Sequence, residues 1–283
     1  MTDIPEILYH YTTQGGLLGL MKSRKIWATN ILFLNDSKEF NHTIQLALEF
    51  LKCDETVIGR DLHKTVEQLF CDFQAPDVYV TSLTAMRDQL SQWRAYCPNL
   101  GGFNLGFETR KLVEVVKAQG IVLIPCNYDL EEQKKIIKNS INITCDSFNQ
   151  KTNVNYNSEG KFDIDSFLEL AGSTRLNYGL QLLLIAPFFK HPKFSEENEL
   201  RFIFYQKKGQ EKKICFREGA STIVPYVEID LVMEAKDPLP IKELVIGPTP
   251  NQELSIKSVE KLIEKYGIQS CDVALSEIPY RAW

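Results

Sequence analysis

The stretch ELRFIFYQ, residues 199–206, opens the run of strand-like segments that decides the fold class. It is rich in aromatic and aliphatic residues, which favour a strand that is buried against neighbours. Glu199 and Arg201 stand two residues apart in it, so both lie on one face of that strand. Four more strand-like segments follow, separated by turn residues, at 213–217, 223–229, 241–246 and 272–275.

The first part of the chain also carries strand-like segments, mixed with stretches of helical periodicity. We expect strands at 7–11, 25–29, 78–83, 103–107 and 121–126. We expect helices at 17–22, 38–51, 54–73, 88–96, 111–117, 130–143 and 254–266, and one or two within 164–189. The polar segment 152–160 is expected to be a loop. Because strands stand at both ends without regular alternation with helices, the pattern predicts an α+β fold with a mixed, mostly antiparallel sheet core and surrounding helices. No repeat or linker interrupts it, so we expect a single domain over residues 1–283.

Composition narrows the class of protein. The 283 residues have a net charge of −5, so a nucleic-acid partner would need a local basic patch. The seven cysteines are scattered singly, which favours reduced thiols in the cytosol over disulfides, and no Cys/His cluster suggests a metal site. The N-terminus does not resemble a signal peptide, and the apolar run 182–189 is too short to span a bilayer. We therefore expect a cytoplasmic protein of bacterial type with no membrane partner.

Common enzyme motifs are missing from the sequence, namely glycine-rich phosphate loops, the G-x-S-x-G elbow and H-E-x-x-H. Three other clusters of polar residues remain. The first is LYHYT, residues 8–12, where His10 and Thr12 could offer a donor and an acceptor to a ribose hydroxyl. The alternative is a core histidine whose ring nitrogens bond to the backbone.

The second cluster combines VYVTSLT, residues 78–84, with LSQWRAY, residues 90–96. Arg94 could contact a phosphate and Tyr96 a flat ring. Alternatively, Leu90 and Trp93 form a core stripe while Arg94 is solvated or paired.

The third cluster is FSEENELRFIF, residues 194–204. A carboxylate at the start of a strand, Glu199, could stabilise positive charge that develops on a sugar carbon. Alternatively, Glu199 and Arg201 form a structural ion pair.

Taken together, these clusters resemble a bacterial family known as domain of unknown function 2971. The resemblance covers about residues 8–248 and rests on LYHYT, IWATNILFLND, LSQWRAYC, GFNLGF, FKHPKFSEENELR and LVIGP. The family name implies no activity.

A second resemblance does imply an activity. LYHYTTQGGLLGLMKSRKIWAT, residues 8–29, is similar to the opening of the ADP-ribosyltransferase superfamily, which binds NAD without a Rossmann site. His10 matches its first-strand histidine, Tyr79 or Ser82 its second-strand position, and Glu199 the glutamate that begins a later strand. The resemblance implies an ADP-ribosyltransferase-like fold with NAD as substrate.

The same resemblance implies residue roles. His10, with Thr12 and Ser82 nearby, would hold a ribose, and Tyr79 or Tyr96 would stack on nicotinamide. Glu199 would accept a hydrogen bond from the ribose 2′-hydroxyl and favour the cation formed when the nicotinamide bond breaks. Arg94, or else Arg201, would pair with pyrophosphate. The acceptor would be a protein, a nucleic acid or water, the last making a glycohydrolase, and a toxin or phage-defence effector would fit this chemistry.

Two other classes remain open. The lysines in 134–138 and 207–213 could supply basic patches for a non-catalytic nucleotide- or nucleic-acid-binding module, although such runs are usually solvated faces. A metal-dependent hydrolase could use Glu196, Glu197 or Glu199, but the sequence clusters no further ligands around them.

Overall fold

The computed structural model describes residues 4–34, 38–52, 63, 78–97, 101–147, 182, 184–206, 212–219, 221–268 and 270–279. The expected loop at 152–160, the helix at 54–73 apart from residue 63, and most of 164–189 lie outside these residues. The chain forms two compact units. The first comprises Met1–Phe33, Asp77–Pro125 and Glu196–Trp283, and the second Leu34–Pro76 and Cys126–Ser195. The expectation of a single domain stays a prediction.

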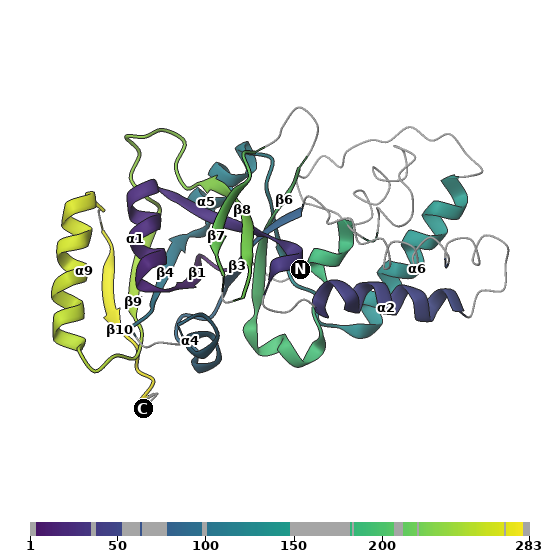
Figure 1. Ribbon diagram of the computed structural model, residues 1–283, viewed down its shortest axis with the longest axis horizontal. Coiled ribbons are helices and arrows are strands. Elements are labelled where there is room, and N and C mark those ends of the chain that lie inside the picture. The colour runs from purple at the N-terminus through teal and green to yellow at the C-terminus, as the bar shows by residue number, and fades with distance from the viewer. Residues whose placement is uncertain are drawn as a thin grey trace. The chain divides into compact units, whose positions relative to one another are not determined.

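The first unit contains every named strand (Figure 1). Its strands are β1 (Ile7–Thr12), β2 (Lys25–Asn30), β3 (Val78–Thr84), β4 (Phe103–Glu108), β5 (Val122–Pro125), β6 (Glu199–Tyr205), β7 (Cys215–Glu218), β8 (Ile223–Asp230), β9 (Ile241–Ile246) and β10 (Asp272–Leu275). Its helices are α1 (Gln14–Ser23), the short η1 (Ile31–Phe33), α4 (Leu90–Tyr96), α5 (Thr109–Ala118) and α9 (Gln252–Tyr266).

These strands form one open sheet in the order β10-β9-β4-β1-β3-β2-β8-β7, with β6 paired to β3 and β5 paired to β6. The β9–β10 pair is parallel and the other pairs are antiparallel. The prediction of an α+β fold with a mixed, mostly antiparallel sheet is therefore confirmed. The strand ranges expected from the sequence agree with those observed to within a few residues.

Strand β3 has three partners although a strand has only two edges. β6 pairs with it along its whole length, from Val78 to Thr84. β1 and β2 must then share the opposite edge: β1 pairs at Thr84, opposite Tyr9, and β2 pairs at Tyr79 and Val80. Between these points the two strands separate, and each continues into its own half of the sheet. We call this place on β3, from Thr81 to Leu83, the fork.

The main hydrophobic core draws on strands from both sides of the fork. Leu8 of β1 and Leu105 of β4 belong to it, as do Ala28 of β2 and Val227 of β8. Helices α1, α5 and α9 bury apolar residues in this same core. On the other face of β1, a smaller cluster joins Tyr11, Trp93 and Val245, with the Tyr11 and Trp93 rings 4.6 Å apart. Helix α4 thus covers the opposite face of the sheet from α1.

Helix α1 is capped at both ends. Thr13 is its N-cap, and the side-chain oxygen accepts from the Gly16 amide at 3.2 Å. The helix ends at Arg24, whose φ of 60° is left-handed and whose amide donates to the Leu20 carbonyl. The reversal at Arg24 leads directly into β2.

The second unit is helical in its described parts: α2 (Lys38–Lys52), α6 (Leu130–Ser147) and the short η2 (Ala186–Phe188), with η3 (Pro192–Glu197) leading into β6. Gln133 is buried in it and donates to the carbonyls of Asn127 at 2.6 Å and Lys190 at 2.9 Å. The remaining amide oxygen of Gln133 lies 2.9 Å from His42 Nε2. This one side chain joins α6 to α2 and to the segment after η2.

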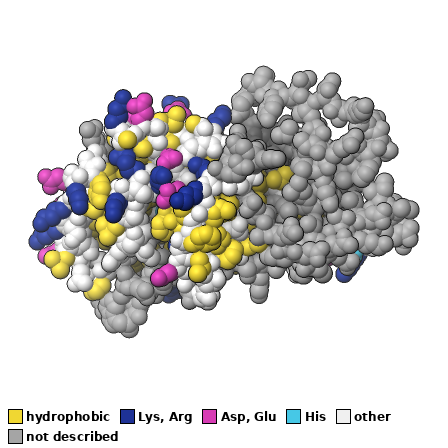
Figure 2. Space-filling model, turned by 45° about the horizontal axis from the view of Figure 1, so that its top comes forward, with side chains coloured by type: hydrophobic (Ala, Val, Ile, Leu, Met, Phe, Trp, Pro, Cys, Tyr) yellow, Lys and Arg dark blue, Asp and Glu magenta, His cyan; other side chains and the backbone are white. Residues whose placement is uncertain are grey.

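Hydrophobic side chains are also exposed around β7 and β8, where Figure 2 shows a yellow area. Phe216 is 67 % and Ile223 68 % exposed, and Trp27 of β2 stacks on Tyr226.

Among the described residues, no helix is long and apolar enough to cross a membrane.

The segment LVIGP ends β9 in a close contact that only glycine permits. The Gly247 amide donates to the Gly102 carbonyl at 2.9 Å, and the Pro248 carbonyl accepts from the Gly101 amide at 3.2 Å. A Cβ at position 247 would lie 2.7 Å from a ring carbon of Trp93. The glycine therefore lets α4 approach the end of β9.

We predict that Gly247→Ala lowers the free energy of unfolding by about 1–3 kcal/mol, because the added methyl overpacks the Trp93 ring. Urea unfolding followed by Trp fluorescence measures this loss. Gly19→Ala is the matched control, since a Cβ there meets nothing within 4 Å and alanine favours a helix. Equal stability of the two variants would contradict the prediction.

Candidate functional site

The first residues of β6 form a buried ion pair. Arg201 donates from Nε to Glu199 Oε1 at 2.7 Å and from Nη2 to Oε2 at 3.0 Å, a bidentate contact. The Glu199 side chain is 4 % exposed and that of Arg201 2 %. The spacing of two predicted from the sequence places both side chains on one face, as observed. The guanidinium therefore fixes the orientation of the carboxylate.

Cross-strand pairing places hydroxyl groups beside this pair. Ser82 of β3 stands opposite Arg201, and Thr84 stands opposite Glu199. Cross-strand partners share a face of the sheet, so these four residues form one cluster, which we call the Glu199 cluster. The Thr84 hydroxyl donates to the Glu197 carbonyl at 2.7 Å and accepts from the Met86 amide at 3.0 Å. That contact joins the end of β3 to the segment before β6.

His10 lies at the fork. Its Nδ1 is 3.0 Å from the Ser82 carbonyl oxygen, on the edge of β3 where β1 and β2 separate. The neighbouring Thr81 hydroxyl donates to the Trp27 carbonyl of β2 at 2.8 Å. Buried backbone carbonyls need donors, and here side chains take the place of the missing ladder bonds. The backbone contact weighed for His10 from the sequence is therefore observed at Nδ1.

The protonation state of His10 follows from this contact. Burial lowers the pKa of the ring below its ordinary 6.5, and the hydrogen bond with Ser82 opposes that shift only in part. A carbonyl oxygen can only accept, so Nδ1 carries the proton. The ring is then neutral near pH 7, and Nε2 is left with a lone pair that can accept a hydrogen bond.

The structure does not gather all the predicted residues in one place. By strand alternation, His10 and Thr12 lie on the face of β1 that carries Leu8 and the main core, whereas the Glu199 cluster lies on the other face of β3 and β6. His10 and the cluster are joined through the backbone of Ser82. Tyr79 is 1 % exposed and belongs to the main core, on the opposite face of β3 from Ser82.

Helix α4 carries the other two predicted residues. Arg94 is exposed, and Tyr96 is half-buried against the cluster of Tyr11 and Trp93. The core stripe that we weighed as an alternative is therefore present at Trp93, which is 1 % exposed. Whether Arg94 or Tyr96 contacts a ligand stays a prediction.

Sequence reasoning missed a second polar network, which lies on the face of the sheet opposite the main core. Arg87 contacts Glu243 Oε1 through Nε at 2.8 Å, and Tyr9 donates to Oε2 at 3.0 Å. Burial and Glu243 together raise the pKa of Tyr9 to about 12. Asp88 accepts from Trp93 Nε1 at 2.6 Å and from the Ser276 hydroxyl at 2.7 Å. Charged residues directly after a buried strand were the available signal for Arg87 and Asp88.

The structure gives no specific support to the other two functional classes, a metal-dependent hydrolase and a nucleotide- or nucleic-acid-binding module. Within the described part of the chain, no group of three or more His, Cys, Asp or Glu side chains could hold a metal ion. Lys134, Lys135 and Lys138 are exposed on α6, and Lys134 pairs with Glu131 at 2.7 Å, as on an ordinary solvated helix face. Most of the second lysine run, 207–211, lies outside the described residues.

Comparison with known proteins gives one match. The model of a family described as "Protein of unknown function (DUF2971)" matches residues 92–202. This interval begins within α4 and ends within β6, so it includes Glu199 and Arg201. The match supports the resemblance to that family over this part of the chain. No curated protein and no solved structure matched.

We predict a pH dependence of stability that comes from His10. Its pKa is lowered on folding, so the unfolded chain binds the proton more readily than the folded chain. The stabilising contribution is complete above the unfolded value of about 6.5 and is lost as pH falls through it. His10→Asn keeps an N–H donor for Ser82 without a titrating group. Urea midpoints between about pH 8 and 5 should fall further for the wild type than for this variant. Parallel pH profiles would contradict the assignment.

Proposed function

We propose that the protein is an NAD-dependent enzyme of the ADP-ribosyltransferase type, with an ADP-ribosyltransferase-like fold, that cleaves the nicotinamide–ribose bond. The observation that carries the proposal is the Glu199 cluster: a carboxylate at the first residue of β6, held in place by Arg201 beside two hydroxyl side chains. The forked sheet and the neutral His10 support it further.

The proposed step makes a demand that a fixed carboxylate can meet. Loss of nicotinamide leaves positive charge on the ribose carbon, and a preorganised negative charge stabilises that charge in the transition state. Arg201 donates one hydrogen bond to each oxygen of the Glu199 carboxylate. The bidentate contact limits its motion, so little reorganisation is needed.

His10 has a separate part in the proposal. Its neutral ring presents Nε2 as an acceptor for a ribose hydroxyl, while Nδ1 remains on Ser82. Since Ser82 stands opposite Arg201, the backbone of β3 couples the position of His10 to the Glu199 cluster. His10 would thus bind the substrate from the main-core side of the sheet, whereas Glu199 would act in bond cleavage from the other side, so the substrate would lie across the fork. The acceptor of the ADP-ribosyl group would be a protein, a nucleic acid or water.

The first prediction concerns Glu199. In purified full-length protein, Glu199→Gln should lower the rate of nicotinamide release from NAD by about 100-fold or more, because the charge that stabilises the cation is lost. Release is measured by chromatography, with and without cell lysate as acceptor. Glu243→Gln is the matched control, since Glu243 also pairs with an arginine, Arg87, on the face of the sheet opposite the main core.

Loss of one partner from a buried pair also destabilises a protein by about 3–5 kcal/mol, so folding must be checked. The double variant Glu199→Gln/Arg201→Met removes both charges and serves as the better-folded inactive form. If a folded Glu199 variant releases nicotinamide at the wild-type rate, the proposal fails. If the wild type binds NAD without releasing nicotinamide, a non-catalytic nucleotide-binding module replaces it.

The second prediction separates binding from cleavage. His10→Asn retains a donor for the Ser82 carbonyl and removes the Nε2 acceptor. We expect the KM for NAD to rise about tenfold while kcat changes little, as for the loss of one hydrogen bond that is present throughout the reaction. Steady-state kinetics of nicotinamide release measure both constants. An unchanged KM would show that Nε2 does not contact the substrate.

A further inference from the structure

Residues 276–278, which follow β10, are held by one carboxylate, and we call them the strap. Asp88 Oδ1 accepts from the Ser276 hydroxyl at 2.7 Å, and Asp88 Oδ2 accepts from the Glu277 amide at 2.7 Å. Asp88 Oδ1 also accepts from Trp93 Nε1 at 2.6 Å. Hydrogen bonds to a charged acceptor are stronger than those between neutral groups. A single carboxylate thus joins the strap to α4 and to the loop that follows β3.

The strap also contacts the sheet and α4. The Ser276 amide donates to the Ile246 carbonyl, at the end of β9, at 2.8 Å. The Ile278 amide donates to the Ser276 hydroxyl at 3.2 Å, and the Ile278 side chain packs against the cluster of Tyr11 and Trp93. The Ser276 hydroxyl therefore bonds both to the carboxylate and within the strap.

The strap can open without unfolding of the sheet. Ile278 is half-buried, and Glu277 and Pro279 are exposed. Segments that bury few apolar side chains open locally at a low free-energy cost. By contrast, Leu8 of β1 and Val245 of β9 are fully buried. We therefore expect the strap to open before the strands beneath it.

The loop at residues 85–89 lies between the strap and the proposed catalytic residue. It contains Asp88, and its main chain is held further by the side chain of Tyr11. The Met86 carbonyl accepts from the Tyr11 hydroxyl at 2.9 Å, and the Gln89 amide donates to that hydroxyl at 3.0 Å. The loop is thus fixed from β1 on one side and by the strap on the other.

The same loop holds residues 196–198, which lead into β6. Gln89 donates from Nε2 to the Glu196 carbonyl at 2.8 Å, and the Ala85 amide donates to the Asn198 carbonyl at 3.4 Å. Asn198 has a φ of 41°, a left-handed conformation that few residues other than glycine adopt unless their surroundings hold them. The loop therefore helps to set the direction in which the chain enters β6.

We propose that the strap is a conformational device that controls the Glu199 site, and that Asp88 is the positioning residue through which it acts. With the strap bound, Asp88 holds the loop 85–89, and the loop holds the entry to β6. When the strap dissociates from Asp88, the loop loses these contacts and Glu199 loses its fixed orientation. The coupling is a property of the fold, whereas its effect on catalysis rests on the proposed function.

Hydrogen exchange of the full-length protein, followed by mass spectrometry of its peptides, tests the coupling. Ser276→Ala removes the hydroxyl that donates to Asp88, and Asp88→Asn removes the charged acceptor. In both variants we expect exchange at least about tenfold faster in the peptides that cover 85–97 and 196–200. Ser276→Thr keeps the hydroxyl and should exchange like the wild type.

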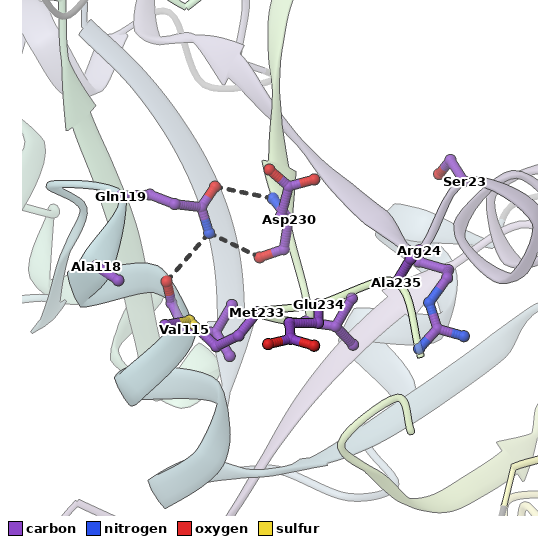
Figure 3. A pocket seen from close by; sticks show the side chains of 10 residues that line it. Ser23, Arg24, Val115, Ala118, Gln119, Asp230, Met233, Glu234 and Ala235 are labelled. Carbon is purple, nitrogen blue, oxygen red and sulfur yellow. Dashed lines mark hydrogen bonds between the residues drawn. The ribbon is translucent and has the colours of Figure 1, made fainter. Parts of the chain in front are cut away.

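The end of β8 is the reference region, because it stands on the other side of β3 in the sheet and is held separately. Figure 3 shows the Gln119 side chain spanning to the main chain of Asp230, whose amide donates to Gln119 Oε1 at 3.0 Å. Exchange in the peptide 223–230 should not change. Ser258→Ala, an exposed change on α9, is the matched control and should leave every peptide unchanged.

Three results overturn the proposal. The first is unchanged exchange in the loop 85–89 of both variants. The second is faster exchange that is confined to the strap, which would show that the strap opens without affecting the loop. The third is equally faster exchange in the peptide 223–230, which would show a loss of global stability.

Nicotinamide release separates this inference from the proposed function. In an active wild type, Ser276→Ala should lower kcat about tenfold and leave the KM for NAD unchanged, because Glu199 loses its fixed position while binding remains. Ser276→Thr should keep the wild-type kcat. An unchanged kcat in a variant whose loop exchanges faster overturns the role of the strap at the site. A wild type that releases no nicotinamide overturns the proposed function, and the exchange pattern still decides whether the strap holds the loop.

Discussion

One edge of β3 carries two strands, and much of the first unit follows from that constraint. β6 occupies the other edge throughout, so β1 and β2 can each pair with only a few residues before they separate. Each then begins its own half of the sheet, and α1 spans the short distance between them. Apolar residues from both halves meet in one core.

The fork leaves backbone carbonyls of β3 and β2 without ladder partners, and side chains supply the missing donors. His10 reaches the Ser82 carbonyl and Thr81 reaches the Trp27 carbonyl. The contact fixes one tautomer of His10, and burial keeps its ring neutral. On the other face, where β3 and β6 pair fully, side chains align in register and bring Ser82 beside Arg201. A single strand therefore organises both the neutral imidazole and the buried ion pair.

Much of the fold could be predicted from the sequence because strands and helices have different hydrophobic periods. Residues 241–246 and 272–275 were predicted as strands with the observed bounds, and helix α9 was predicted to within two residues. The Glu199–Arg201 contact could also be predicted from the sequence, since side chains two residues apart on a strand share a face. The sequence did not predict which face of the sheet His10 and Tyr79 lie on, because a short strand at a fork lacks the simple alternation of buried and exposed residues. The networks of Glu243 and Asp88 join residues more than 150 positions apart, which local patterns do not encode.

The sequence by itself determined the α+β class, the position of most elements and the residue types that can perform chemistry at His10 and Glu199. These properties depend on local periodicity and on the functional groups of individual side chains. Only the tertiary structure decided which strands share β3, that Tyr79 is a core residue, and that Asp88 holds the segment after β10. The physical reason is that strand pairing and contacts between distant segments depend on long-range packing, which selects one arrangement among many that the same local patterns allow.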